Sequence, residues 1–303
     1  MDLKALRYFV AIADAGSLTA AAAAISIAQP ALTRQMRELE ADLGATLFHR
    51  MPRGVRLTQA GVTLYESAHR ILAEAQRVRQ SLARPGSDER TTVAVGVTPT
   101  LSRLLLPGLF EHCIRTLQDV ELRSREAFTP ELLDLLERGM IDMAVVTNPS
   151  ASQSLSLQPL LGEPFALVSN PALGLAPVMA VSALARIPLV MTTLHRDLVE
   201  RQLLPLGKKL NVHTVIDSVD SIRALVQKGS WATVMPVSVF NEASPSGQVT
   251  MSQITGVQLT RLVVLATRIE ANGKRALPLI QDMIEAEVSR LMLEGMFTFN
   301  TAA

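Results

Sequence analysis

Cysteine is almost absent from this chain of 303 residues, which contains Cys113 alone. One cysteine excludes an intrachain disulfide, and therefore also a scaffold or redox switch that depends on one. Cys113 follows Leu105 and Leu109 at helical spacing, which favours a place in a hydrophobic core over a role as a nucleophile.

Long hydrophobic runs are also missing, because every apolar stretch is short or interrupted by charge, so no membrane span is predicted. The first residues, "MDLKALRYFVAIADAG", lack a secretory pattern and place their apolar side chains on one helix face instead. We therefore expect a cytoplasmic protein with no membrane partner.

Excess charge of either sign is lacking, since the formal net charge is +1. The balance is uneven along the chain: residues 1–90 hold 12 basic and 9 acidic side chains, and the remainder hold 17 and 19. A mildly basic front end weakly supports a polyanionic partner. With 48% hydrophobic residues, the chain has ample core material for two or three domains.

Catalytic motifs are not found. The sequence has no G-x-S-x-G, no P-loop and no G-x-G-x-x-G. No two histidines have the spacing of metal ligands; they are His49, His69, His112, His195 and His213. We therefore expect no metal, no cofactor and no enzymatic activity, while an enzyme remains a low-ranked alternative.

What the sequence does contain begins with three consecutive helix signals. A first helix over about 2–14 ends near Gly16, Ser17 can cap the Ala-rich "LTAAAAAI", and a helix over 28–42 ends before Gly44. This order is a helix-turn-helix, although the alanine run alone could be a generic helical tract. In the third helix Leu32, Met36, Leu39 and Leu43 form an apolar stripe, leaving an opposite face to explain.

The next segment, "LFHRMPRGVRLT", predicts a two-stranded wing with a turn at its Pro-Arg-Gly. It is basic, with no acid over 45–65, and suits phosphate contacts, although a solvated loop is the simpler interpretation of the hairpin alone. Thr58 then begins a long helix to about 83. Its apolar residues repeat every 3.5 positions, which predicts a homodimer through 58–83 rather than packing on its own chain; they are Leu64, Ala68, Ile71, Ala75, Val78 and Leu82.

A polar Pro-Gly segment over 83–90 predicts a hinge. Beyond it, strand-like runs alternate with helical ones, which predicts an α/β module with largely parallel sheets, large enough for two lobes. The strand candidates begin at 91, 120, 140, 165, 188, 212, 232 and 259, and the helical stretches lie near 101–117, 129–138, 195–207, 219–229 and 274–294.

The front end resembles the LysR-type transcriptional regulators over about 60 residues. The resemblance rests on "LRYFVAIADAGSLTAAAAAISIAQPALTRQMRELEADLGATLFHR" followed by "RGVRLTQAG", with "VDSIRALVQKGSWATVMP" as a weaker match, from which Trp231 departs because the family usually has a small residue there. It implies a winged helix-turn-helix at 1–58, a dimerisation helix and hinge at 59–90, and an effector-binding module at 91–303. That module would be periplasmic-binding-protein-like, with lobe I at about 91–161 and 266–303 and lobe II at about 162–265.

By this resemblance, the third helix would enter the major groove of operator DNA. Its base-contacting residues would be Gln29, Pro30, Thr33 and Arg34, while Arg37, Arg50 and Arg53 would hold phosphate or the minor groove. The side-chain chemistry agrees, since Arg can bind guanine and Gln adenine through two hydrogen bonds, and Pro or Thr can touch a thymine methyl. Ordinary solvated charge is the simpler interpretation of each arginine by itself.

The resemblance also implies a small-molecule effector between the lobes. Hydroxyls at helix starts and strand ends suit an anion, although Ser and Thr there are also ordinary N-caps. The candidate residues are Thr98, Pro99, Thr100, Leu101, Ser102, Phe128, Thr147, Thr192, Thr193, His195 and Trp231. A regulator whose cleft is filled by Phe128 and Trp231, and which therefore takes no effector, is the main alternative.

Three further expectations come from the family alone. These are a homotetramer built from the dimers, an inverted-repeat operator with a T-N11-A-like core, and RNA polymerase as a further partner to consider.

Overall fold

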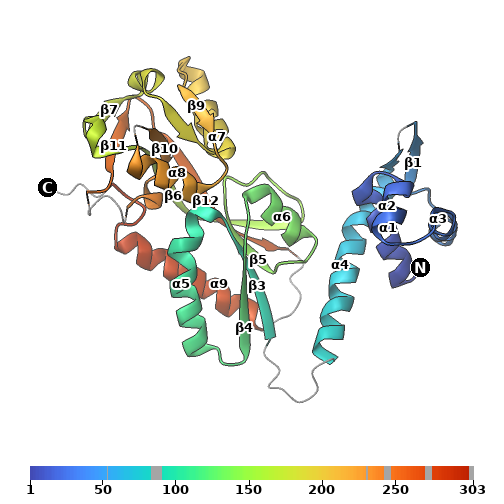
Figure 1. Cartoon of the computed structure of the whole chain (residues 1–303). Helices are drawn as coiled ribbons and strands as arrows, with labels where there is room; N and C mark the ends of the chain where they lie inside the picture. Colours follow the sequence, from blue (N-terminus) through green and yellow to red (C-terminus); the bar gives the residue numbers. More distant parts are fainter. Residues whose placement is uncertain (53, 83–90, 230, 242–246, 270–274, 300–303) are drawn as a thin grey trace. The chain divides into compact units, whose positions relative to one another are not determined.

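The computed structural model describes residues 1–52, 54–82, 91–229, 231–241, 247–269 and 275–299. The chain divides into two compact units (Figure 1): Met1–Arg90 with Asp134–Asp142, and Thr91–Leu133 with Met143–Ala303. The predicted hinge over 83–90 lies outside the described residues, and so does Arg53.

The N-terminal part of the first unit is built, in the residues that the structure describes, on four helices and a hairpin. Its elements are α1 (Leu3–Ala15), α2 (Leu18–Ala24), α3 (Gln29–Leu43), β1 (Phe48–Met51), β2 (Gly54–Leu57) and α4 (Gln59–Leu82). Ser17 caps α2 by accepting from the Ala20 N–H, and Gly16 and Gly44 end α1 and α3 in the left-handed conformation. The predicted helix-turn-helix and wing are therefore present.

Two expectations in this unit are corrected. Leu43 is 38% exposed rather than part of the core stripe, because it is the last residue of α3 and the chain turns away at Gly44. The predicted seam on α4 divides in two, since Leu64 and Ala68 pack into the unit's own core while Ile71 and Val78 remain exposed.

The sheet of the second unit joins two lobes. Within the described ranges its path is β4-β3-β5-β12-β6-β10-β8-β9, with β11 pairing β6 and β7. The strands are β3 (Thr91–Val97), β4 (Val120–Glu126), β5 (Met143–Thr147), β6 (Leu155–Ser169), β7 (Val178–Ala180), β8 (Leu189–Met191), β9 (Val212–Val215), β10 (Ala232–Pro236), β11 (Thr250–Thr255) and β12 (Thr260–Arg268).

Helices cover this sheet in both lobes. They are α5 (Pro99–Thr116), α6 (Thr129–Glu137), α7 (Thr193–Leu203), α8 (Val219–Lys228) and α9 (Ala276–Leu293), with short turns η1 (Pro171–Leu173), η2 (Val181–Arg186), η3 (Leu204–Leu206) and η4 (Val237–Val239). In lobe I, α5 and α9 lie side by side (Figure 1) and share one core with β3, β5 and β12. Cys113 is buried in that core, as its spacing predicts.

The sheet is mixed rather than largely parallel. β3, β4 and β5 are parallel in lobe I and β8, β9 and β10 in lobe II, but β6 and β12 run antiparallel to their neighbours. β6 pairs with β12 over its first part and with β10 and β11 over its second, so it belongs to both lobes. The predicted lobe limit at 161/162 falls inside this strand, and Val263–Leu265, on the lobe II side of the predicted limits, pair with β5 of lobe I.

Candidate DNA-contact surface and interlobe pocket

The exposed face of α3 has the form expected of a base-reading surface. Gln29 and Pro30 are exposed at its start, and Pro30 lies in the first turn, where a missing N–H leaves no bond unmade. Thr33 donates its hydroxyl to the Gln29 carbonyl at 3.0 Å, so the helix itself satisfies that hydroxyl and the methyl remains for apolar contact. The opposite face is anchored by Leu32, which is fully buried.

Arg34 is a highly exposed charge on this face. Its side chain is 77% exposed, and its Nε lies 3.4 Å from Glu38 one turn later. An exposed pair of this kind contributes little stability, so Arg34 can exchange Glu38 for a nucleic acid at low cost. Arg37 is exposed on the same helix.

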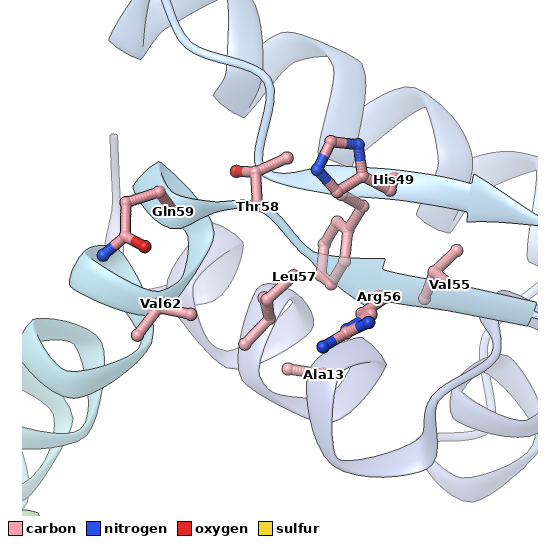
Figure 2. Close-up of a pocket in the computed structure, with 9 residues that line it drawn as sticks. Ala13, His49, Val55, Arg56, Leu57, Thr58, Gln59 and Val62 are labelled. Atoms are coloured by element: carbon pink, nitrogen blue, oxygen red, sulfur yellow. The ribbon is translucent and has the colours of Figure 1, made fainter.

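The wing carries basic side chains on both of its faces. His49 and Arg56 are cross-strand partners and so share one face, while Arg50 pairs with Val55 on the other. A shallow groove of about 630 Å³ runs from His49 and Arg56 to Thr58 and the start of α4 (Figure 2). Because this groove is open to solvent, it fits contact with a large partner better than capture of a small molecule.

Two contacts hold α4 and the wing against the helices. Tyr65 donates to the Asp14 carboxylate, and burial together with this bond raises the pKa of Tyr65 to about 12. Glu40, on α3, accepts the Leu47 N–H at 2.7 Å and the Phe48 N–H at 3.4 Å, which fixes the start of β1 relative to α3.

The second unit contains a pocket between its lobes, with a volume of about 260 Å³. Six of the sequence-predicted residues line it: Thr98, Pro99, Thr100, Phe128, Thr147 and His195. The other lining residues are Thr129, Pro130, Leu133, Asn148, Ser150, Leu194, Leu198, Arg201 and Arg261. None of these is acidic, and the volume limits a ligand to a small molecule.

The remaining predicted residues lie elsewhere. Leu101 is in the lobe I core and Ser102 bonds to Glu126, outside the pocket. Thr192 caps α7, and Thr193 bonds to Asp217 through both its amide and its hydroxyl.

Trp231 packs on the lobe II cluster beside His213, with ring centroids 5.2 Å apart, so it does not fill the pocket. Phe128 forms part of the wall without closing it.

The start of α5 offers unsatisfied donors to the pocket. Thr98 is the N-cap residue and is 2% exposed, yet its side chain makes no capping bond. Among the described residues its hydroxyl has no hydrogen-bond partner at all. A buried hydroxyl without a partner is destabilising, and next to the first-turn N–H of Thr100 it forms a site suited to an anionic oxygen.

A buried ion pair lies beneath this site. Arg261, on β12, donates from Nε to Glu163 Oε2 at 2.8 Å and from Nη1 to the Thr100 hydroxyl at 2.7 Å. Glu163, on β6, accepts the Ser238 N–H from η4 at 2.9 Å. Both ionic side chains are buried, at 2% and 0% exposed, so each depends on the other for charge compensation.

His195 is held in its neutral form. Burial, and secondarily the charge of Arg261, lower the pKa of His195 from 6.5 to about 3. Thr192 Oγ1 accepts a hydrogen bond from the backbone N–H of His195 at 3.2 Å, and it lies 2.7 Å from the ring atom Nδ1 of the same residue. The positive charge around the pocket therefore comes from Arg201 and Arg261.

Sequence reasoning did not find Arg201, Arg261 or Asn148. Arg201 and Arg261 lie within segments that read as ordinary helix and strand. Asn148 has a positive φ of 46°, which Asn tolerates better than most residues, and it exchanges hydrogen bonds with the Leu262 backbone. The Asn directly after a strand is the one local signal that could have indicated this turn.

Comparisons with known proteins cover both units. Residues 3–62 match the family described as bacterial regulatory helix-turn-helix protein, lysR family, and residues 86–288 match the LysR substrate binding domain. The chain is 30% identical over 253 residues to a hydrogen peroxide-inducible genes activator of Pectobacterium carotovorum, covering 82% of this chain and 84% of that protein. It is 28% identical over 301 residues to the nitrogen assimilation regulatory protein nac of Klebsiella aerogenes, covering 97% and 98%.

Solved structures show the same architecture. A full-length OxyR variant from Pseudomonas aeruginosa is 26% identical and covers 94% of both chains, with a TM-score of 0.62. The structure of full-length CbnR complexed with its target DNA is 22% identical, covers 95% of this chain and all of that one, and has a TM-score of 0.54, which supports the fold alone.

Proposed function

Because the chain belongs to the LysR family of DNA-binding transcriptional regulators, we propose that α3 reads operator bases and that the interlobe pocket binds a small anion that modulates regulation. The protein is a regulator with a helix-turn-helix domain and a substrate-binding domain, and not an enzyme. The observation that carries the effector proposal is the unpartnered, buried Thr98 hydroxyl at the start of α5, in a pocket lined by two arginines and no acid.

Base reading is assigned to Gln29, Pro30, Thr33 and Arg34, and phosphate or minor-groove contacts to Arg37, Arg50 and Arg53. The exposure of Gln29 and Arg34 supports this assignment. A contact made through two hydrogen bonds is worth roughly 1–3 kcal/mol of discrimination, so Arg34→Ala should lower the preference for operator over random duplex about 5- to 150-fold.

The matched control is Arg115→Ala, which removes an exposed arginine of the second unit and should leave that preference unchanged. Both variants are compared with the parent by titrating labelled operator and random duplexes at one salt concentration. Equal losses on the two duplexes for Arg34→Ala would assign Arg34 to the backbone and refute its base-reading role.

The effector proposal is tested by calorimetry with a panel of small carboxylates. Thr98→Val keeps the size of the side chain and removes its hydroxyl, so it should weaken the best ligand about tenfold. A panel in which no carboxylate binds would favour a regulator that works without an effector. Binding that Thr98→Val does not change would refute the role of the Thr98 hydroxyl.

A homodimer through 58–83 is supported by the exposed Ile71 and Val78 on α4, at 37% and 48%. Sedimentation of Val78→Glu should show a loss of self-association, whereas an unchanged mass would place the interface elsewhere. The family analogy extends this to a homotetramer on an inverted-repeat operator, with RNA polymerase as a partner of the bound complex.

Cellular location and domain limits complete the proposal. No described helix has the length and apolar character that crossing a membrane requires. We place the regulator in the cytoplasm, where its DNA would be, and keep 1–58, 59–90 and 91–303 as its domains.

A further inference from the structure

We propose that Arg261 reads the charge of the ligand through the edge formed by its Nη1 and Nη2 atoms, and that Glu163 is the internal counter-ion that orients this edge and compensates it when the pocket is empty. This inference rests on the proposed function, because it specifies how the same pocket recognises its anion. Arg261 and Glu163 lie on the strands that join the lobes, and not at the helix starts.

The geometry of the pair leaves part of the guanidinium unused. Nε and Nη2 both lie near the same carboxylate oxygen, Oε2, at 2.8 and 2.6 Å, instead of each taking one oxygen. The contact at Nη2 is close but not aligned as a hydrogen bond, and Nη2 has no other partner among the described residues. Arg261 lines the pocket, where Nη2 and the N–H of Nη1 that does not donate to Thr100 can donate to a ligand.

Both carboxylate oxygens of Glu163 already have a hydrogen-bond partner. Oε2 faces Arg261, and Oε1 accepts the Ser238 N–H at 2.9 Å. A guanidinium buried this deeply without a counter-ion would strongly destabilise the folded protein. Glu163 compensates its charge in the protein without a ligand. The carboxylate also weakens the attraction for an incoming anion, because it is a like charge close by.

The pair therefore selects for one ligand chemistry. A planar carboxylate can take the Arg261 edge together with the Thr98 hydroxyl, while its apolar body packs against Phe128, Leu133 and Leu198. Glu163 already neutralises Arg261, so Arg201 compensates the charge of the ligand. The pocket therefore suits a ligand with one negative charge better than a ligand with two. The predicted class is a small monocarboxylate with a hydrophobic body.

The same hydrogen bonds connect the ligand site to the two strands that join the lobes, β6 and β12. Arg261 and Glu163 are register partners on β12 and β6, the strands that join the lobes. Arg261 also bonds to Thr100 at the start of α5 in lobe I, and Glu163 to Ser238 in η4 of lobe II. A carboxylate that pulls on the guanidinium therefore acts on bonds that belong to both lobes.

The experiment uses benzoate and benzamide, which have the same shape and differ in charge, with the full-length protein in calorimetry and thermal melts. Benzoate should bind the parent at least tenfold more tightly than benzamide. Glu163→Gln removes the competing charge, so it should strengthen benzoate binding at least tenfold and leave benzamide unchanged. Its melting temperature should also rise more steeply with added benzoate than that of the parent.

A different result is expected if the Arg261–Glu163 pair contributes to stability alone. The double variant Glu163→Met, Arg261→Met replaces the pair by apolar side chains, and it should bind benzoate no better than benzamide. Retention of the parent's discrimination in this variant would assign the pair to stability alone. Arg115→Gln removes an exposed arginine outside the pocket and is the control for loss of charge.

If Glu163→Gln does not fold, Arg261→Lys keeps the charge and the partner but lacks the planar edge. It should lose at least tenfold of the discrimination, and parent-like binding would refute the inference. Failure of this inference is distinguishable from failure of the proposed function. If the parent binds benzoate at least as tightly as Glu163→Gln does, only the counter-ion role of Glu163 is refuted. A Glu163→Gln protein that takes up no benzoate refutes it as well.

Discussion

Acidification should destabilise lobe II through a single buried imidazole, that of His195. Its pKa is lowered from 6.5 to about 3, chiefly by burial and then by the charge of Arg261. Between these two values the unfolded chain binds a proton that the folded chain refuses, so stability is complete above pH 6.5 and falls as the pH drops toward 3. At pH 5.0 the loss relative to neutral pH is about 2 kcal/mol, since each pH unit below 6.5 contributes about 1.4 kcal/mol.

The assay uses the one tryptophan of the chain. Trp231 packs on lobe II, so its emission during urea unfolding reports on the lobe that contains His195. The free energy of unfolding is measured at pH 7.5 and 5.0 for the parent and for His195→Asn. Other groups also titrate in this range, and the difference between the two proteins isolates the histidine.

We expect the parent to lose about 2 kcal/mol more than His195→Asn between the two pH values. His112→Asn removes an exposed histidine of lobe I and should follow the parent. An equal loss in the parent and in His195→Asn would show that the imidazole already charges in the folded protein, which would refute the burial argument.

The remaining predictions concern packing. Gly61→Ala should lower the melting temperature of the first unit, against the gain of about 1 kcal/mol that alanine usually brings to a helix, because its Cβ would lie 2.2 Å from the Leu47 carbonyl oxygen; a raised value in circular dichroism melts would contradict this. Glu40→Ala should cost about 1–3 kcal/mol by leaving the Leu47 and Phe48 N–H groups without their acceptor, and Glu40→Gln less; equal losses would show that charge dominates. Burial raises the pKa of the Cys113 thiol, so a thiol-specific disulfide reagent should label it only after denaturant is added, and rapid labelling of the native protein would show an open core.

Elements that depend on near neighbours could be predicted from the sequence. The cap at Ser17, the left-handed Gly16 and Gly44, and the hairpin over 48–57 follow from residues within a few positions of one another. The same holds for the strand at 91–97, whose limits match the described β3. The part of β6 before Phe165 was not predicted, because Leu155–Pro164 mixes apolar and polar residues with two prolines and gives no clean period.

Part of the pocket could likewise be foreseen, because Thr98 and Thr100 follow a strand and open a helix. The larger part could not. Arg261 meets Glu163, 98 positions earlier, through the register of two antiparallel strands, and neither residue has a neighbour that marks it.

The sequence by itself therefore determined the winged helix-turn-helix, its exposed polar face and the alternation of strands and helices, because these follow from backbone propensity and short-range periodicity. Only the tertiary structure decided which hydroxyls face the pocket, that Trp231 stays out of it, and that a buried Arg261–Glu163 pair lies between the lobes. Those features depend on strand register and on desolvation, and both are properties of groups brought together from distant parts of the chain.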